Sequence, residues 1–551
     1  MDTLKDQIED WNERKRHTPE KLELARAALN DIQQGMKVFE AIRRHPITAE
    51  GGGYIGKHLL VAAYREMVET GEMDEDQVLL SKIRMKPTRT QSGVTVVTVL
   101  TKPYPCPGKC IFCPTDVRMP KSYLPDEPGA MRALHHQFDP YEQVAARIEA
   151  LDAVGHPTDK IELLILGGTW SSYRKDYQEW FVHRLFDAMN GAGASHAPEV
   201  YQERMPLDRL DLAAAQEVNQ TAAHRNVGLV IETRPDHIDA EELAWLRYLG
   251  VTKVQLGAQS FDDHILEINK RGHDAQATRR AVALLRAAGF KIVLHWMPNL
   301  YGATPESDRL DFARMWEGHC PDEIKIYPNQ LLENAELYQY WQKGLYQPYT
   351  TEELIELLVE IKPTVPRYCR INRVIRDIPS TNVVAGNKRT SLRMDVHNEM
   401  KQRGTACQCV RCREVRGRSV DEGSLVFSDL VYQTGEAEEH FLAFNTPEDR
   451  LAGFLRLSLP GAESPETGLK DLAGAALIRE VHVYGQSVEV GDSKEGAAQH
   501  IGLGTSLLER AEELAREKGY DTLAVISAVG TREYYAGRGF EMGDLYMVKG
   551  I

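Results

Sequence analysis

Short apolar runs alternate with longer amphipathic stretches through the middle of the chain. The apolar runs predict buried strands at 94–100, 161–166, 227–232, 251–258, 291–297 and 323–327. Helical apolar spacing occurs at 140–154, 177–189, 240–249, 275–288, 307–316 and 352–361. Strands that are joined by helical crossovers form a parallel sheet. Six such repeats over residues 86–362 predict an incomplete (β/α)6 barrel.

The flanking segments follow other patterns, so we expect an α/β multidomain protein. Residues 1–85 show helical spacing and predict a helical accessory segment that binds RNA or packs on the barrel. Residues 363–420 break the alternation and are expected to form a basic linker. Residues 421–551 predict a small α+β domain, because an amphipathic helix lies among expected antiparallel strands at 425–432, 440–444, 451–457, 475–484 and 522–527. A chain of 551 residues can hold several such domains.

The charge of the chain is uneven. The formal net charge is −15, which argues against polyanion binding by the surface as a whole. Residues 82–125 nevertheless hold eight Lys or Arg and one acid, and residues 362–416 hold thirteen and four. Such tracts can bind nucleic acid locally, although each alone also fits a solvated face. The candidate nucleic-acid contacts are Lys82, Lys86, Arg89, Arg370, Arg373 and Arg376.

The sequence predicts a cytoplasmic protein. No run of about 18 apolar residues is present to span a membrane. The first sixteen residues are charged throughout and lack the apolar core of a signal peptide. The eight cysteines fall in two clusters plus Cys320 and Cys369, which suits metal sites in a reducing compartment better than disulfides.

The first cysteine cluster, Cys106, Cys110 and Cys113, follows the first expected strand at C-x3-C-x2-C spacing. Thiolates favour iron–sulfur clusters or zinc. Three cysteines leave one iron of a 4Fe-4S cluster open, because such clusters usually take four. With Phe112 beside the last cysteine, the loop resembles the radical-SAM signature. A zinc knuckle and unligated thiols are the alternatives.

Other polar residues gather at the same ends of the expected strands, where barrel enzymes place their active sites. Gly167, Gly168 and Thr169 follow the second strand and resemble the radical-SAM glycine motif that holds the methionine amino group. Glu232 ends the third strand and Gln259 ends the fourth. We therefore expect these five residues to bind S-adenosylmethionine, although each alone is compatible with a structural role.

The second cysteine cluster, Cys407, Cys409 and Cys412, puts three thiols within six residues and predicts a structural zinc site. Cys320 is the expected fourth ligand, because it lies just before the sixth strand. Cys369, His319 and His397 are alternatives for that ligand. A thiol cluster without metal and a second iron–sulfur cluster are alternatives for the site.

A glycine loop opens the amphipathic helix of the C-terminal domain. It runs through Gln499, His500, Ile501, Gly502, Leu503, Gly504 and Thr505. A helix N-terminus of this kind presents backbone N–H groups to phosphates, and the loop resembles the pyrophosphate loop of GNAT acyl-CoA enzymes. We expect these residues, Val483 and Tyr535 to bind acetyl-CoA. Tyr534 and Tyr535 are the candidate catalytic residues at the CoA sulfur, and two packed tyrosines are the alternative.

Seven motifs along the chain occur in the order of the Elongator catalytic subunit family, which the chain resembles over about residues 80–551. They are Cys106-x3-Cys110-x2-Cys113 and the segments 254–260, 271–273, 325–328, 376–379, 479–485 and 530–535. Few other families fuse a radical-SAM barrel to a C-terminal acetyltransferase domain, so the resemblance is specific. The single chain resembles a stand-alone prokaryotic member. Gln255 departs from the acid that is common at its position.

The resemblance implies carboxymethylation of the wobble uridine of tRNA. A 5′-deoxyadenosyl radical, from a 4Fe-4S cluster and S-adenosylmethionine, would take hydrogen from the acetyl methyl group. The carbon radical would add to carbon 5 of uracil, and oxidation and thioester hydrolysis would leave a carboxymethyl group. The implied partners are the anticodon arm of tRNA, the two small-molecule cosubstrates and an external reductant, with a homodimer left open.

Two other functions remain open from the sequence. The first is a protein lysine acetyltransferase, with the barrel as an RNA-binding remnant and Glu480 as the catalytic base. An intact C-x3-C-x2-C loop argues against an inert barrel. The second is a tRNA-binding protein without catalysis, which two apparent cofactor sites disfavour.

Overall fold

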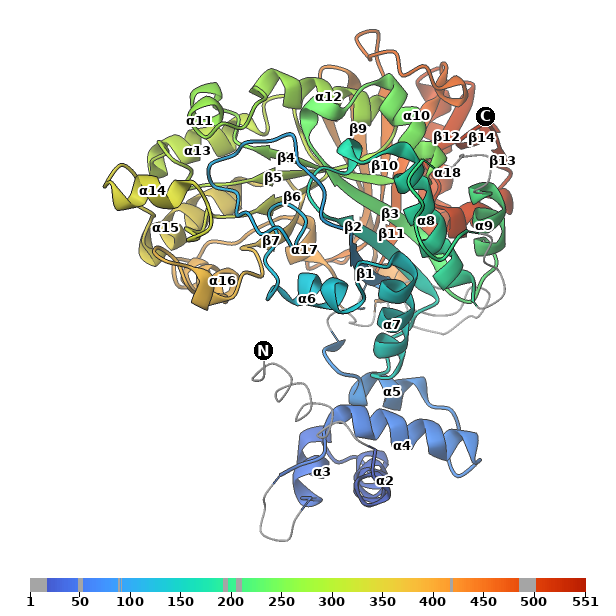
Figure 1. Cartoon of the computed structure of the whole chain (residues 1–551). Helices are drawn as coiled ribbons and strands as arrows, with labels where there is room; N and C mark the ends of the chain where they lie inside the picture. Colours follow the sequence, from blue (N-terminus) through green and yellow to red (C-terminus); the bar gives the residue numbers. More distant parts are fainter. Residues whose placement is uncertain are drawn as a thin grey trace.

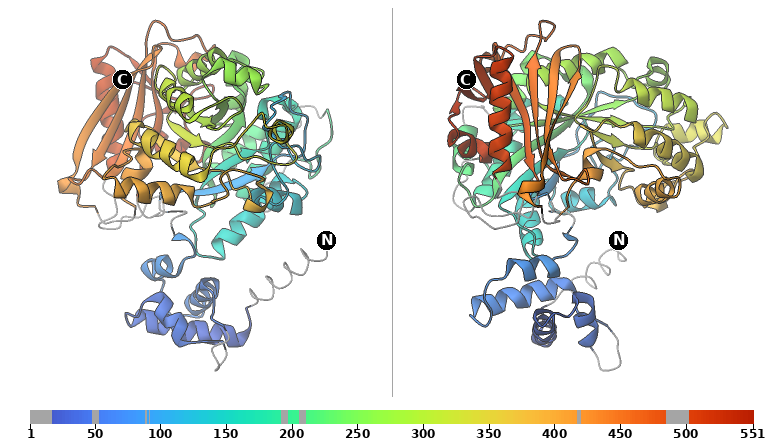
Figure 2. Two further views of the ribbon diagram at one scale, coloured as in Figure 1. Left: turned by 90° about the vertical axis from the view of Figure 1, so that its left-hand side faces the viewer. Right: turned by 180° about the vertical axis from the view of Figure 1, so that it is seen from behind.

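Two seven-stranded sheets and an N-terminal group of helices make up the protein (Figure 1). This computed structural model describes residues 17–47, 53–87, 90, 92–191, 197–204, 211–416, 420–484 and 502–551. The N-terminal helices are α2 (Pro19–Gln33), α3 (Val38–Arg44), α4 (Lys57–Glu69) and α5 (Gln77–Ile83). They enclose an apolar core of their own and lie below both sheets (Figure 2). Arg65 joins them to the body by an ion pair with Asp152 at 2.6 Å.

The first sheet is parallel throughout and curled, with its strands in chain order. They are β1 (Thr95–Leu100), β2 (Lys160–Leu166), β3 (Arg225–Thr233), β4 (Lys253–Gln259), β5 (Lys291–Trp296), β6 (Glu323–Ile326) and β7 (Arg370–Val374). β1 and β7 are the two edges, so the sheet is a half barrel. The expected parallel sheet is confirmed.

The expected number of six strands is wrong, because β7 lies inside the tract that was expected to be a basic linker. β7 pairs with β6 in parallel. Only Ile371 and Val374 of its five residues are buried apolar side chains. Arg370 and Asn372 point instead to acidic partners, Glu414 and Glu323. A strand stabilised by ion pairs lacks the apolar run on which a sequence-based assignment depends.

Helices pack around the half barrel, most of them on its outer face, while the first and last of them also border its cavity (Figure 1). They are α6 (Pro128–His135), α7 (Pro140–Asp152), α8 (Lys175–Asn190), α9 (Leu212–Asn219), α10 (Ala240–Tyr248), α11 (Asp263–Ile268), α12 (Ala275–Ala287), α13 (Pro305–Arg314), α14 (Leu337–Gln342), α15 (Thr351–Ile361), α16 (Leu392–Gln402) and α17 (Val410–Arg413). Side-chain caps fix where several begin. Thr304 and Thr350 form capping boxes at α13 and α15.

The second sheet is mixed, with the order β13-β14-β12-β11-β10-β9-β8. Its strands are β8 (Val426–Gln433), β9 (Ala437–Asn445), β10 (Leu451–Pro460), β11 (Ala476–Val483), β12 (Thr522–Val525), β13 (Glu541–Met542) and β14 (Met547–Gly550). The expectation of antiparallel pairing throughout is wrong, because β11 and β12 are parallel. A crossover through α18 (Leu503–Glu517) joins them, and its apolar stripe packs on the sheet.

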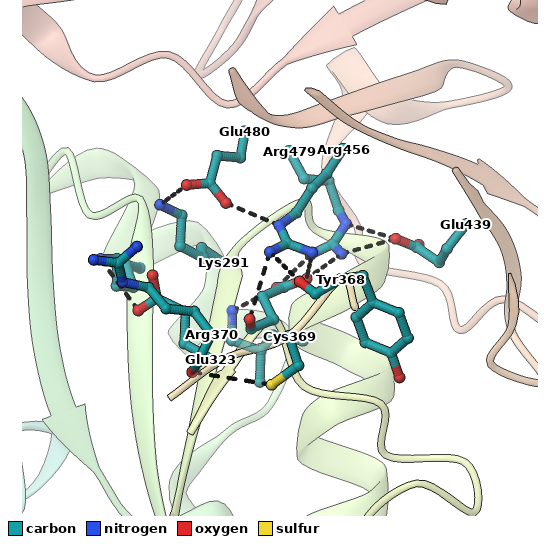
Figure 3. A network of polar contacts seen from close by, with 12 residues as sticks. Lys291, Glu323, Tyr368, Cys369, Arg370, Glu439, Arg456, Arg479 and Glu480 are labelled. Carbon is teal, nitrogen blue, oxygen red and sulfur yellow. Dashed lines mark hydrogen bonds and ion pairs between the residues drawn. The ribbon is translucent and has the colours of Figure 1, made fainter. Parts of the chain in front are cut away.

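The second sheet docks on the amino-terminal ends of the half-barrel strands through buried ion pairs (Figure 3). Asp322 lies just before β6 and accepts two hydrogen bonds from Arg479 of β11, at 2.7 and 2.8 Å. Arg456 of β10 contacts Asp322 at 3.4 Å and Glu480 at 2.8 Å. Burial opposes ionisation of Asp322, but the two guanidinium groups outweigh it and hold its pKa well below the ordinary value. Buried ion pairs therefore join the two sheets, beside the apolar contacts of a shared core.

No helix of the described part of the chain is long and apolar enough to cross a membrane.

We predict that Asp322→Asn strongly destabilises this interface. Removing one partner of a buried ion pair costs about 3–5 kcal/mol, since Arg479 would keep only Glu439 as a counter-charge. Because the pKa of Asp322 is depressed in the folded protein, its contribution is fully present above about pH 4 and is lost only as the pH falls further. Thermal unfolding at pH 5–8 should therefore show a constant deficit for the variant.

Glu513→Gln is the matched control, because Glu513 pairs with Arg510 on the exposed face of α18. Its loss should cost under about 1 kcal/mol. Equal melting temperatures for Asp322→Asn and Glu513→Gln would contradict a charge-dependent interface.

Candidate active site

One cavity of about 1810 Å³ runs through the inside of the half barrel and opens against the second sheet. The first cysteine loop lines one end, and Gly502, Gly504 and Tyr534 line the other. The cysteines follow the carboxyl end of β1, whereas the second sheet sits at the amino ends of the strands. β1 has six residues, and a strand of that length spans about 20 Å. The two ends of the cavity are therefore separated by roughly one strand length.

Three thiols and two arginines form the cysteine end. Arg271 Nη1 lies 3.6 Å from Cys110 Sγ, and Thr169 Oγ1 lies 3.5 Å from Cys106 Sγ. Arg234 packs against Gly108, where a Cβ would meet its Nη1 at 2.6 Å. Burial, followed by the charge of neighbouring Cys110, raises the pKa of the Cys113 thiol to about 12. Free thiolates are unfavourable here, so the site suits a metal cluster that replaces the thiol protons.

Unpaired guanidinium donors around the cysteine loop fit an anionic ligand. Arg234 Nη1 and Arg271 Nε are buried, and neither has a hydrogen-bond partner among the described residues. Buried guanidinium donors are normally satisfied. A 4Fe-4S cluster held by three thiolates carries negative charge that both arginines face. Sequence reasoning did not place these arginines in the site, although Arg234 directly follows β3 and Arg271 lies between α11 and α12, after β4.

The expected S-adenosylmethionine residues gather beside the cysteines, with one exception. Gly168, Thr169, Glu232 and Gln259 line the cavity, and Gly167 lies behind them. Gly167 has a φ of +143°, and a Cβ there would overlap the Thr101 hydroxyl. Gln259 has a φ of +74°, and its Oε1 is buried without a hydrogen bond in the described part of the chain. Gln259 is thus a cavity-lining residue whose side-chain acceptor is unsatisfied among the described residues.

Polar side chains on the inward positions of the strands line the lumen between the two ends. His295 Nε2 lies 2.9 Å from Gln255 Oε1, which pairs Gln255 with a protein group. Nearer the second sheet, Lys253 contacts Glu162 at 2.6 Å and Glu323 at 3.5 Å. These residues alternate with apolar ones along their strands. That alternation is the signal in the sequence that could have identified them.

At the other end of the cavity, β11 and β12 separate. They pair only over Ala476–Ile478 and Leu523–Val525, whereas β11 continues to Val483. Val481, His482 and Ile526 line the cavity beyond the paired region. A strand edge that is freed in this way can hold an extended ligand by backbone hydrogen bonds. The opening can therefore accept a thin acyl-bearing arm.

The start of α18 lies at this opening. Gly502 caps the helix with a φ of +71°, and Arg538 donates to Thr505 Oγ1 at 3.0 Å. Val483 and Gly504 are adjacent, since a Cβ at Gly504 would lie 3.8 Å from Val483 Cγ2. Leu503 is buried as the first residue of the helix. Gln499, His500 and Ile501 lie outside the described residues.

The two candidate catalytic tyrosines have different surroundings. A Cβ at Gly504 would lie 2.7 Å from the Tyr534 hydroxyl, which therefore reaches the helix start. The Arg538 guanidinium stacks 3.6 Å above the Tyr534 ring. Tyr535 packs edge-on against Phe540 in the apolar core under α18, and burial raises its pKa. Tyr534 is thus better placed than Tyr535 to meet a ligand at this opening.

The second cysteine cluster is assembled without Cys320. The Sγ atoms of Cys407, Cys409 and Cys412 lie within 4.8 Å of one another. The Cys320 thiol is directed to the Trp316 carbonyl, at 3.4 Å. His397 Nε2 lies 4.0 Å from Cys412 Sγ. The donor set of three thiols suits zinc, and the geometry favours His397 over Cys320 as the fourth ligand.

The basic residues occupy three kinds of position. Lys82 and Lys86 are exposed beside the N-terminal helices, and Arg89 lies outside the described residues. Arg370 and Arg376 face the cavity but are paired with Glu414 and Glu127. The Arg373 side chain is 44% exposed and pairs with Asp377. Of the expected contacts in the second tract, Arg373 is the most accessible to an RNA phosphate.

Comparison with known protein families agrees with this geometry. The model of the Radical SAM superfamily matches residues 104–314. The model of the Radical_SAM C-terminal domain matches residues 321–402, which include β7. The half barrel is thus a radical SAM domain.

Individual relatives are similar over nearly their whole length. A tRNA uridine(34) acetyltransferase of Dehalococcoides mccartyi (strain CBDB1) is 42% identical, over 84% of this chain and 99% of the relative. Elongator complex protein 3 of Danio rerio is 35% identical, over 86% and 87%. A solved structure, the archaeal Methanocaldococcus infernus Elp3 with an N-terminal deletion, superposes with a TM-score of 0.69 at 36% identity, over 84% of this chain and all of that one.

We predict that Gly504→Ala weakens acetyl-CoA binding about tenfold, because overpacking against Tyr534 costs about 1–3 kcal/mol. The new Cβ would lie 2.7 Å from the Tyr534 hydroxyl. The double variant Gly504→Ala/Tyr534→Phe removes that hydroxyl and should recover most of the affinity. Titration calorimetry with acetyl-CoA measures both, with Tyr534→Phe alone as the control. Equal affinities of the single and double variants would show that this contact is not the cause.

Proposed function

The chain belongs to the family of tRNA uridine(34) acetyltransferases and Elongator complex protein 3, and we propose that it converts the wobble uridine of tRNA to 5-carboxymethyluridine. The two-carbon unit would come from acetyl-CoA, with S-adenosylmethionine as the source of the radical. The observation that carries this proposal is the single cavity, which is lined at one end by the cysteine loop and at the other by the start of α18.

Cys106, Cys110 and Cys113 would hold the 4Fe-4S cluster, whose open iron supplies reductive cleavage of S-adenosylmethionine when the cluster is bound. Arg234 and Arg271 would compensate its charge. Gly167 and Gly168 would let the cosubstrate approach the backbone closely, because side chains do not fit there. Thr169, Glu232 and Gln259 would supply polar contacts to its amino, carboxylate and sugar groups.

The acetyl-CoA end would use the second sheet as a GNAT domain. The N–H groups at the start of α18, from Gly502 to Thr505, would bind the pyrophosphate. Val483 and the free edge of β11 would hold the pantetheine arm. Tyr534 would donate its proton toward the CoA sulfur, since its hydroxyl lies at the helix start, with Tyr535 supporting it from the core.

The anticodon arm would bind mainly through its phosphates. Lys82 and Lys86 beside the N-terminal helices and Arg373 at the cavity wall are the proposed contacts. A base in a single-stranded loop can turn out of its stack into a cavity. A cavity of about 1810 Å³ is large enough for such a base together with a cosubstrate.

Protein lysine acetylation is less well supported by the geometry. Glu480, the candidate base for that reaction, is bonded to Lys291 and Arg456 at the sheet interface. Burial raises its pKa, but these two cations outweigh burial and lower it. A carboxylate held ionised by two cations is a poor acceptor for a further proton.

Cys407, Cys409, Cys412 and His397 are proposed to bind a structural zinc ion beside β7. Cys409 comes directly before α17, and the Val410 N–H bonds to the Cys369 carbonyl at 2.9 Å. The site would thus fix the segment after the half barrel to its last strand.

We predict that Cys110→Ser abolishes S-adenosylmethionine cleavage and tRNA modification, because two thiolates cannot hold the cluster. Acetyl-CoA affinity should change by less than about twofold, since the two ends of the cavity are independent sites. Mass spectrometry of tRNA digests would detect carboxymethyluridine, and chromatography would detect 5′-deoxyadenosine. Wild-type enzyme supplied with both cosubstrates, tRNA and a reductant is the positive control, and its failure to modify uridine would refute the proposed function.

We predict that Cys409→Ser and His397→Ala each lower bound zinc from about one per chain, because four ligands complete a structural site. Cys320→Ser should keep its zinc, since its thiol faces Trp316. Metal analysis of purified variants by plasma mass spectrometry measures the difference. Zinc loss in Cys320→Ser with retention in His397→Ala would reverse the ligand assignment.

A further inference from the structure

His482 is a titratable residue with a buried ring nitrogen that has no role in the proposed function. It lies on β11 in the region where β11 and β12 have separated, and it lines the cavity. Its Nε2 atom is buried and has no hydrogen-bond partner among the described residues. A buried ring nitrogen without a partner is uncommon in folded proteins.

Its neighbours along the strand fix the direction of the ring. Glu480 and Tyr484, two residues before and after His482, contact Lys291 of β5 and Arg370 of β7. Side chains two residues apart on a strand share one face. His482 therefore points toward the lumen of the half barrel, while Val481 packs on the α18 side. The Tyr484 ring, 4.4 Å away between centroids, supports it from the same face.

Burial keeps the His482 ring neutral. Burial lowers the pKa of His482 to about 4; Lys291 and Arg370 add to this effect, and Glu480 and Glu162 oppose it. A neutral imidazole accepts a proton at working pH. Its conjugate acid is strong and gives the proton up again readily. Glu480 differs because each of its carboxylate oxygens is already bonded to a cation, whereas His482 Nε2 has no partner among the described residues.

The reaction of the proposed function includes a step that none of the assigned residues performs. The thioester of the modified acetyl unit must be hydrolysed to leave a carboxylate. An arm held on the free edge of β11 beside Val483 would bring its thioester next to His482, one residue away. Water that enters from the lumen would approach the carbonyl on the His482 side.

We infer that His482 is the general base that activates water for hydrolysis of the CoA thioester, an assignment that rests on the proposed function. The water oxygen bonds to the carbonyl carbon while a water proton passes to Nε2, and the carbon–sulfur bond breaks with its electron pair on sulfur. The sulfur takes a proton from Tyr534 or from the imidazolium. The products are a carboxylic acid, which ionises, and free CoA, so no oxidant or reductant is needed.

Hydrolysis can be tested apart from the radical chemistry. Full-length wild-type, His482→Ala and His482→Gln proteins would be incubated with acetyl-CoA and tRNA, and free CoA would be measured with a thiol reagent. Both variants should release CoA about 100-fold or more slowly, the usual contribution of a general base. Acetyl-CoA affinity by calorimetry and 5′-deoxyadenosine formation should stay near wild type. His264→Ala, on the exposed start of α11, is the matched control and should be unaffected.

Chemical rescue separates a base from a packing residue. Added imidazole should restore CoA release to His482→Ala, in proportion to the concentration of its unprotonated form, but should not accelerate the wild type. An unchanged rate in both variants would overturn the inference. Lost release together with lost acetyl-CoA binding and no rescue would also overturn it, because His482 would then serve only packing. His482-dependent hydrolysis in an enzyme that makes no carboxymethyluridine would refute the proposed function and leave this assignment standing.

Discussion

The buried charge layer between the two sheets is the constraint on which the rest of the molecule depends. Asp322 lies at the amino end of β6 and is clasped by Arg479 and Arg456 of the second sheet. Buried charges are costly unless their partners are in place. The layer therefore restricts how the second sheet can dock on the half barrel. The docked position brings the separated edges of β11 and β12 over the open lumen of the half barrel.

The cost of burying unpaired charge also explains how the lumen is lined. The half of the lumen nearer the second sheet is lined by Lys253, Glu162 and Glu323, and Lys253 pairs with both carboxylates. The other half presents Arg234 and Arg271 with donors unsatisfied among the described residues. Paired charges contribute to the structure. Arg234, which pairs with Asp236, and Arg271 each keep one buried donor that can bind a ligand. Paired and unpaired donors thus distinguish the structural part of the cavity wall from the part beside the cysteine loop, where an anionic cofactor would fit.

Sequence patterns predicted the parts of this protein that depend on local order. The apolar runs marked six strands of the half barrel, and the spacing of Cys106, Cys110 and Cys113 marked the cluster loop. The apolar runs and the cysteine spacing are both local patterns, because each spans only a few consecutive residues. β7 was missed because its polar residues are satisfied by Glu414 and Glu323. The position of Cys320 and the pairing of Arg376 with Glu127 depend on contacts between distant segments, which no local pattern contains.

The distance of one strand length between the two ends of the cavity sets the order of events. In the proposed reaction, an acetyl group held at β11 and a radical formed at the cysteine loop would lie too far apart to react where each is first held. One of the reacting groups would therefore have to move through the lumen. The flexible thioester arm and the flipped nucleobase are the groups that could do so. Turnover in such an enzyme would use the two ends of the cavity one after the other. The rate of turnover would then depend on movement of these groups through the lumen as much as on either chemical step.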